Sequence, residues 1–244
     1  MSARSQAFVS NLLLQRMPPG DFALLAAHLI RTDLPQASVL HLPGDPLDTV
    51  HFFESGIASV IVAGRNDWQA EVGQVGREGL HGRAAIVEFG EVGIRVEMCL
   101  AGSSWSIAVA DFDRAMEESG TLRPFLTRYV QSFDIQVIQT LLSTARYTIH
   151  QRVSRWLLMC QDRVGDRLLV THAQLAVILS IRRASVTIEL QVLEGMRAVR
   201  ATRGEVLIRD RSLLLEIASG SYGIPEEAYE RLLPVNARPL LAQI

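Results

Sequence analysis

Two adjacent arginines, Arg182 and Arg183, mark the part of the sequence whose residue types suit contact with a polyanion. Val186, Leu190 and Leu193 follow them at spacings of four and three, which predicts a helix with one apolar face. A guanidinium group forms paired hydrogen bonds with a phosphate or with O6 and N7 of guanine, and a helix N-terminus adds positive charge. The pattern therefore predicts a helix whose first turn faces a nucleic acid.

The outward face of this helix, predicted from about Arg182 to Glu194, supplies the candidate contacts. Arg183 would bind guanine, and Arg182 and Ser185 would hold phosphates. Apolar Ala184 and Ile188 would suit thymine methyl groups, unless the arginines are merely solvated and Ile188 packs under the following hairpin. With two positions from neighbouring elements, the candidate DNA-binding residues are Thr171, Arg182, Arg183, Ala184, Ser185, Thr187, Ile188, Gln191 and Arg203.

The elements around this helix are those of a winged helix-turn-helix. Two capping boxes, Thr148–Gln151 and Thr171–Gln174, predict the starts of two earlier helices, because each places a Gln three residues after a Thr. A tight turn at Ser180-Ile181 joins the second helix to the third, and a hairpin follows over residues 198–208. Three helices and a hairpin in this order are typical of that motif.

The first half of the chain predicts a β-rich domain. Apolar runs at Ala37–Leu42, Val50–Phe53 and Ile57–Ala63 each end at a turn-forming cluster, which for the second run is Glu54-Ser55-Gly56. Further glycine turn signals, Gly90 among them, continue to Gly102. An antiparallel sandwich or jelly roll fits this pattern. Before it, Pro18-Pro19-Gly20-Asp21 predicts the start of a short amphipathic helix.

A long helix is predicted between these two parts. From Leu122 to Ala145 the apolar spacing changes to three and four, and a helix of this length spans roughly 36 Å. Packing on its own domain is one use of such a stripe, but its coiled-coil-like spacing favours pairing with a second copy. The candidate dimer seam consists of Leu126, Val130, Phe133, Val137 and Leu141.

Charge is distributed unevenly along the 244 residues. Residues 1–146 carry a net charge of −5, residues 147–218 carry +4 and residues 219–244 carry −1. All 24 cationic side chains are arginine, so composition alone explains part of this bias. The local excess of positive charge is a modest electrostatic signal for nucleic acid.

Other classes of protein find little support in the sequence. No stretch is apolar enough to span a membrane and the start lacks a signal-peptide pattern, so a cytoplasmic protein with no membrane partner is expected. Cys99 and Cys160 are too few for a four-thiolate iron–sulfur cluster, and no metal site or other cofactor is expected.

No catalytic residue is expected either. Sequence signatures of hydrolases, zinc proteases and nucleotide-binding enzymes are absent. His41 and His51 lack the spacing of a metal-binding pair, which leaves a cupin-like enzyme as a remote alternative. An interaction protein that does not bind DNA is a further alternative, which a steep fall of DNA affinity with salt would exclude.

The segment Leu175–Thr187 resembles the recognition segment of the CRP/FNR family of transcription regulators. The family's helix end resembles Leu193–Gly195, and its wing resembles Arg203–Arg211. The loop that enters its sensor cassette is similar to Gly76–Gly82. The resemblance extends from about residue 44 to 215. It implies a homodimer that binds the major groove of palindromic operators in double-stranded DNA, with RNA polymerase as a candidate further partner.

The implied fold is α+β. It comprises an N-terminal double-stranded β-helix (jelly roll), a long dimerisation helix and a C-terminal winged helix-turn-helix. The expected domains are a cyclic-nucleotide-binding-like sensor over residues 1–118, the dimerisation helix over 119–146, the DNA-binding domain over 147–218 and a tail over 219–244.

The sequence departs from the family's pattern in the nucleotide cassette. Cyclic-nucleotide binders of the family carry Gly-Glu-[aliphatic]-[small] and Arg-[Ser/Thr]-Ala, which bind the ribose and the phosphate. Here Gly82-Arg83-Ala84-Ala85 and Arg95-Val96-Glu97 stand instead, so Glu97 lies beside the expected phosphate. Cyclic AMP is therefore not expected as the effector. Arg83 and Arg95, with Gly82, would either bind another anion or be surface arginines, and the effector stays unknown.

The recognition segment departs from the family as well. Ser180 stands where the family usually has Gly in the turn, and Ala184 stands where it usually has Glu. The DNA-binding prediction survives both changes, but the family's usual operator sequence is not expected.

Overall fold

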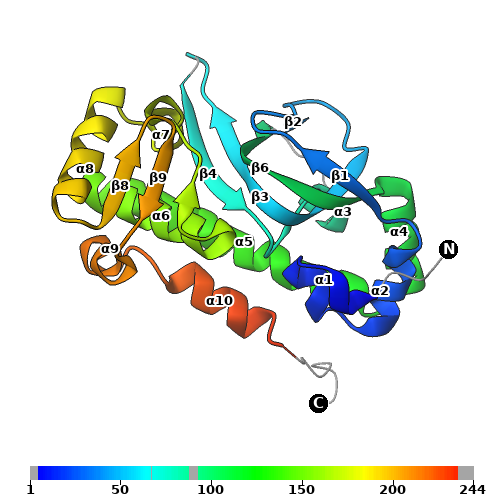
Figure 1. Cartoon of the computed structure of the whole chain (residues 1–244). Helices are drawn as coiled ribbons and strands as arrows, with labels where there is room; N and C mark the ends of the chain where they lie inside the picture. The colour runs from blue at the N-terminus through cyan, green and yellow to red at the C-terminus, as the bar shows by residue number, and fades with distance from the viewer. Residues whose placement is uncertain (1–4, 67, 88–92, 236–244) are drawn as a thin grey trace.

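A computed structural model describes residues 5–66, 68–87 and 93–235 of the chain. An antiparallel sheet forms one end of the molecule and a small winged helix domain the other, while one long helix, α5 (Leu122–Arg146), runs along both (Figure 1). The turn predicted at Gly90 lies outside the described residues. Within them, no helix has both the length and the apolar character needed to cross a bilayer.

The N-terminal part combines short helices with a six-stranded antiparallel sheet. The α2 helix begins where the Pro-rich segment predicted a helix. The helices are η1 (Gln6–Phe8), α1 (Leu12–Arg16), α2 (Pro19–Ala26), α3 (Arg83–Val87) and α4 (Val109–Glu118), and the strands are β1 (Ile30–Leu34), β2 (Val39–His41), β3 (Thr49–Ala63), β4 (Gln69–Val75), β5 (Leu80–His81) and β6 (Ile94–Ala108).

Two 15-residue strands, β3 and β6, form the centre of the sheet. They pair along nearly their whole length, from Thr49 opposite Ala108 to Val62 opposite Ile94. Different strands flank their two halves, because β5 pairs with the start of β3 and β4 with its end, while β1 and β2 pair with separate parts of β6. Such changes of partner along one strand are consistent with the predicted jelly roll.

The turn predicted at Glu54-Ser55-Gly56 is wrong, because β3 continues through it as a bulge. The register against β6 shifts there, and Gly56 adopts a φ of +78°. Opposite it, Gly102 lies inside β6, where a Cβ would come within 2.0 Å of the Ser55 carbonyl oxygen. These glycines allow two strands to approach closely at a bend and do not reverse the chain.

The winged helix domain has the predicted order of elements. Both capping boxes form. The backbone N–H groups of Gln151 and Gln174 donate to the Thr148 and Thr171 hydroxyls, and both Gln side-chain oxygens accept the backbone N–H of the same Thr. The elements are α6 (Ile149–Val164), β7 (Arg167–Leu168), α7 (His172–Ile178), α8 (Arg183–Gly195), β8 (Val199–Thr202), β9 (Glu205–Ile208) and α9 (Arg211–Ala218), with the strands in the order β7-β9-β8.

The segment predicted as a tail from residue 219 contains a further helix, α10 (Ile224–Leu232), beside α5 (Figure 1). Its Tyr229 hydroxyl donates to the Glu78 carbonyl at 2.7 Å, and Glu230 pairs with Arg16 at 2.8 Å. The helix start is visible in the sequence as Gly223-Ile224-Pro225-Glu226, because Pro in the first turn and an acid at the third helical position are typical start signals.

Candidate nucleic-acid interface

The α8 helix begins after a turn that requires a left-handed residue. Ser180 has a φ of +50°, the conformation that the family's usual Gly adopts without strain. Arg182 is the residue before the first turn and Arg183 opens it; both side chains are exposed. The predicted basic first turn therefore projects into solvent at the positive end of the helix dipole.

Polar contacts brace α8 against the other helices of its domain. The Thr187 hydroxyl lies 3.0 Å from Nδ1 of His172 on α7, so this partly buried side chain also contacts α7. On the opposite side, His150 Nδ1 on α6 lies 2.8 Å from Oε2 of Glu189. These contacts fix the orientation in which α8 presents its exposed residues. No sequence signal singled out His172 or His150 for this role.

A groove of about 450 Å³ separates α8 from the wing. Its walls bring together five of the predicted DNA-binding residues, from the start of α7, from α8 and from the wing: Thr171, Arg183, Thr187, Gln191 and Arg203. The other four lie outside the groove, on or beside the exposed start of α8: Arg182, Ala184, Ser185 and Ile188.

The exposure of Ile188 decides whether this side chain packs under the hairpin or faces solvent. Its side chain is 58% exposed and does not pack under the hairpin, which is a property of Val186, Leu190 and Leu193. A large apolar side chain exposed beside a basic turn is available to contact a thymine methyl.

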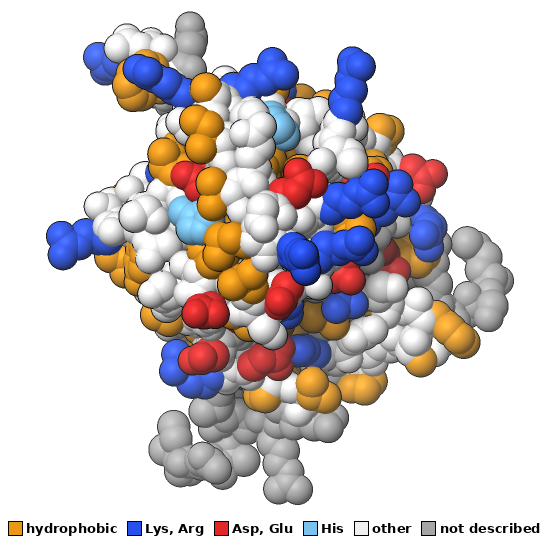
Figure 2. All heavy atoms as spheres, turned by 60° about the vertical axis from the view of Figure 1, so that its left-hand side comes forward, with side chains coloured by type: hydrophobic (Ala, Val, Ile, Leu, Met, Phe, Trp, Pro, Cys, Tyr) orange, Lys and Arg blue, Asp and Glu red, His pale blue; other side chains and the backbone are white. Residues whose placement is uncertain are grey.

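Several arginines on the exposed side of this domain are unpaired, whereas most of its acids are engaged. Among the described residues of the winged helix domain, the exposed arginine side chains that form no hydrogen bond or ion pair are Arg182, Arg183, Arg197, Arg200, Arg203 and Arg209. By contrast, Glu189, Glu194 and Glu205 bind His150, the Ala201 N–H and Arg167. Basic side chains project at several points of this end of the molecule, with acidic ones between them (Figure 2). Arg197, Arg200 and Arg209 were not among the predicted DNA-binding residues. They contribute to the net charge of +4 of residues 147–218, and that charge excess is the sequence signal that could have identified them.

The predicted effector residues are largely satisfied by the protein itself. Gly82 has a φ of +109°, and a Cβ there would lie 2.8 Å from the Val50 side chain. Arg83 stacks over Phe133 of α5 with its guanidinium carbon 3.7 Å from the ring centre, and its Nη1 has no hydrogen-bond partner among the described residues. Arg95 forms an ion pair with Glu97 at 2.6 Å.

The predicted dimer seam needs a correction, because its residues face different surroundings. Leu126 is fully buried in its own domain, and Phe133 is 5% exposed against the sheet. Val130 and Val137 are partly buried against the same clusters, and only Leu141 is strongly exposed, at 70%. A spacing of three and four fits every side of a helix, so it could not show that the sheet covers this stripe.

A different side of α5 is exposed. Its apolar residues are Ile138, Leu141 and Leu142, with exposed fractions of 60%, 70% and 43%. Exposed Gln131, Asp134 and Ala145 continue the same stripe at spacings of three and four.

Three histidines that the sequence spacing did not connect meet on the sheet. The ring of His81 lies 5.7 Å from that of His41 and 6.3 Å from that of His51. Burial lowers the pKa of His51 to about 4, so the ring is neutral at pH 7. No group of three or more potential ligands within the described ranges has a geometry that could hold a metal ion.

A buried carboxyl joins the sheet to the winged helix domain. Glu71 on β4 accepts hydrogen bonds from the Ser59 hydroxyl and from the Trp156 ring N–H of α6, the latter at 3.0 Å. Burial raises its pKa from 4.5 to about 7, and the two hydrogen bonds only partly oppose this effect. The carboxyl therefore changes charge near neutral pH at the contact between the domains.

Comparison with known proteins agrees with this geometry. Residues 151–217 match the Crp-like helix-turn-helix domain. No curated protein matches the chain.

Among solved structures, a CRP/FNR-family transcriptional regulator from Eubacterium rectale is 16% identical with a TM-score of 0.66, over 84% of this chain and 97% of that one. FixK2 from Bradyrhizobium japonicum is 12% identical with a TM-score of 0.66, over 79% and 98%. A CRP-family regulator from Thermus thermophilus is 18% identical with a TM-score of 0.65, also over 79% and 98%. The chain therefore carries a Crp-like helix-turn-helix domain and shares the fold of solved CRP/FNR-family transcription regulators, which confirms the predicted resemblance.

Proposed function

We propose that the protein is a sequence-specific transcription regulator that binds palindromic operators as a homodimer and does not respond to cyclic AMP. The observation that carries the DNA-binding part is the set of exposed, unpaired arginines at the start of α8 and on the wing. Because no carboxylate of the described residues neutralises them, their full charge is available to phosphates.

The α8 helix enters the major groove with its first turn towards the bases. Arg183 lines the groove between α8 and the wing and makes the paired contact to guanine, while Arg182 and Arg203 bind phosphates on either side. The methyl groups of Ala184 and Ile188 contact thymine. With Ala184 in place of an acid, this surface has no acceptor there for a cytosine amino group, so the operator differs from the family's usual one.

The homodimer forms through the exposed side of α5. Ile138, Leu141 and Leu142 together would leave an apolar patch in water on a single chain, and a parallel pairing of two α5 helices covers it. Leu141→Glu places two charges in this seam, and sedimentation should show a monomer. Thr144→Glu, on the same turn but beside the seam, should remain a dimer. A monomeric wild type, or an unchanged Leu141→Glu dimer, would contradict the seam.

Cyclic AMP is not the effector, because the phosphate-binding Arg of the cassette is occupied. Arg95 pairs with Glu97, so an incoming phosphate meets a neutralised arginine and a carboxylate. Calorimetry should detect no micromolar binding of cyclic AMP, and operator affinity should change by less than about tenfold, or 1.4 kcal/mol, when it is added.

A second candidate effector is a different anion bound at Arg83, whose Nη1 lacks a hydrogen-bond partner among the described residues. An iron–sulfur cluster is not proposed, because Cys99 and Cys160 supply two of the four thiolates that such a cluster needs, and both are buried.

Selection from a pool of random DNA duplexes tests the DNA-binding proposal. The purified protein should enrich a two-fold symmetric sequence whose half-sites are centred about 10 base pairs apart, one turn of the duplex. Arg183→Ala should lose preference at one base pair of each half-site. Failure of the wild type to enrich any sequence, or enrichment of a site without symmetry, would overturn it.

A further inference from the structure

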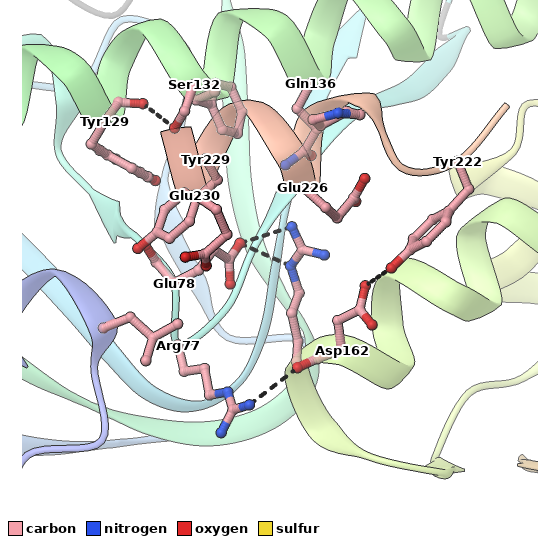
Figure 3. Close-up of a pocket in the computed structure, with 14 residues that line it drawn as sticks. Arg77, Glu78, Tyr129, Ser132, Gln136, Asp162, Tyr222, Glu226, Tyr229 and Glu230 are labelled. Carbon is pink, nitrogen blue, oxygen red and sulfur yellow. Dashed lines mark hydrogen bonds and ion pairs between the residues drawn. The ribbon is translucent and has the colours of Figure 1, made fainter. Parts of the chain in front are cut away.

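A cavity of about 290 Å³ lies where the sheet domain, α5, the winged helix domain and α10 meet (Figure 3). Its apolar walls are mainly aromatic, with Tyr129 and Phe133 on α5 and Tyr229 on α10. Its charged groups comprise four carboxylates and two guanidinium groups. The cavity therefore combines aromatic surface with acidic and basic groups.

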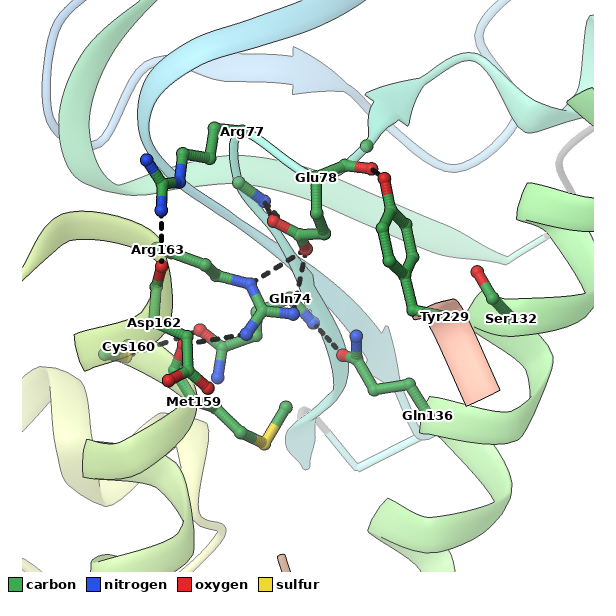
Figure 4. Close-up of polar contacts among 12 residues, drawn as sticks. Gln74, Arg77, Glu78, Ser132, Gln136, Met159, Cys160, Asp162, Arg163 and Tyr229 are labelled. Atoms are coloured by element: carbon green, nitrogen blue, oxygen red, sulfur yellow. Dashed lines mark hydrogen bonds and ion pairs between the residues drawn. The ribbon is translucent and has the colours of Figure 1, made fainter. Parts of the chain in front are cut away.

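Most of these charges are already paired. Arg163 donates from Nε to Oε1 of Glu78 at 2.8 Å, and its Nη1 donates to the Met159 carbonyl at 2.7 Å (Figure 4). Asp162 binds Arg211 at 2.9 Å and accepts a bond from the Tyr222 hydroxyl. Glu230 pairs with Arg16. These contacts leave little capacity on the walls for a further ligand charge.

Among the acids of the lining, Glu226 is the exception. Its Oε2 accepts the Gly223 N–H at 3.1 Å, whereas its Oε1 accepts no hydrogen bond from the residues that the structure describes. Partial burial raises the pKa of this carboxyl, and Arg163 and Arg155 oppose the effect only in part. Nearby, the Gln136 side-chain oxygen already accepts the Gln74 N–H at 2.7 Å (Figure 4). The carboxyl oxygen left without a donor in this lining is thus an acidic acceptor.

We propose that this cavity binds a small organic cation with a flat apolar body. The cationic group donates hydrogen bonds to Glu226, and the flat body packs against Tyr129, Phe133 and Tyr229. An anion is repelled by the Glu226 carboxylate, and a neutral ligand gains no charged hydrogen bond from it.

The position of the cavity links the ligand to DNA binding. Glu78 belongs to the sheet domain, whereas Asp162 and Arg163 belong to α6 of the winged helix domain. A ligand held between them stabilises one arrangement of the two domains and changes the affinity for DNA accordingly. This second step rests on the proposed function, whereas binding of the cation does not.

Benzamidine, a flat aromatic cation, tests the site against two near-isosteres, neutral benzamide and anionic benzoate. Calorimetry on the full chain should show benzamidine binding in roughly the millimolar range, with both analogues at least about tenfold weaker. Glu226→Gln should weaken benzamidine at least about tenfold, because a charged hydrogen bond is lost. The Gln oxygen can still accept the Gly223 N–H at the start of α10, so the fold is preserved.

Two further variants complete the test. Glu227→Gln removes the exposed neighbouring acid on α10 and should bind benzamidine as the wild type does. Ser132→Leu fills part of the cavity from α5 and should abolish binding. No binding to the wild type, equal binding of the three compounds, or full binding by Glu226→Gln would overturn the site.

Titration of a selected DNA duplex with and without benzamidine separates the two proposals. Unchanged DNA affinity at saturating benzamidine overturns the regulatory step alone. A protein that binds benzamidine but never binds DNA overturns the proposed function and leaves the cation site standing.

Discussion

The winged helix end and the nucleotide cassette both carry arginines suited to an anion, but the two regions use them differently. On α8 and the wing, Arg182, Arg183 and Arg203 project from rigid elements and pair with nothing among the described residues. In the cassette, Arg95 pairs with Glu97, and Arg83 lies over the Phe133 ring. The same residue type is therefore available to a ligand in one region and largely committed to the fold in the other.

This difference separates binding from stability. Removing a side chain that only contacts solvent leaves the folded state nearly unchanged and costs binding. Removing one that is packed or paired internally costs folding free energy first. Variants in the two regions should consequently fail in different assays.

The largest expected effect is on stability, at the contact between α5 and the cassette. Phe133→Ala removes a ring that is 5% exposed and carries the Arg83 guanidinium, so the free energy of unfolding should fall by about 3–5 kcal/mol. Arg183→Ala should change it by less than about 0.5 kcal/mol. Urea denaturation of both variants measures the contrast, and similar losses would remove the distinction between the regions.

The next effect concerns pH and the Glu71 carboxyl between the domains. Its pKa is raised in the folded state to about 7, so the neutral form is favoured there. The contribution of Glu71 to the free energy of unfolding is fully present below pH 4.5 and is lost as pH rises through 7. The total loss is up to about 3 kcal/mol.

Glu71→Gln keeps an acceptor for the Trp156 N–H but cannot ionise. Its free energy of unfolding should vary less between pH 5 and 8 than that of the wild type. Thermal or urea unfolding across this range checks the sign, and a wild type that gains stability towards pH 8 relative to the variant would contradict it.

A smaller effect is expected on DNA recognition. Arg183→Ala should reduce discrimination at one base pair by about 1–3 kcal/mol, because a paired contact to guanine is lost. Arg182→Ala should weaken all sequences more evenly, since a phosphate contact carries no sequence information. Competition titrations with single-base variants of the selected duplex distinguish these patterns. Identical profiles for both variants would argue against the assigned roles.

The smallest effect is at the turn before α8. Ser180→Gly should stabilise the fold by up to about 1 kcal/mol, because Gly adopts a φ of +50° without strain. Thermal unfolding measures this gain. A loss of stability would mean that the unfolded-state entropy of Gly outweighs the relief of strain.

Local signals in the sequence were sufficient for the winged helix domain. Its capping boxes at Thr148 and Thr171 involve residues three positions apart, so sequence spacing and geometry are nearly the same information. The start of α10 carries a similar local signal in Pro225 and Glu226, although its short length made it easy to miss.

Features that depend on distant segments could not be predicted in the same way. Which side of α5 is covered depends on the sheet and α10, so the periodicity of the helix fitted both Phe133 and Ile138 as seam residues. Gly56 suggested a turn, and only the approach of Gly102 from β6 shows why a bulge forms instead. The groove between α8 and the wing likewise exists only after folding.

The central claim is that the unpaired arginines of α8 and the wing bind duplex DNA, and its salt dependence is the most direct test. Fluorescence anisotropy with a short duplex, from about 50 to 200 mM salt, should show a steep linear fall of log affinity with log salt concentration. For Arg182→Ala combined with Arg203→Ala, the slope should become shallower by about one for each phosphate contact removed. An affinity that does not depend on salt, or a slope unchanged in the double variant, would contradict the account.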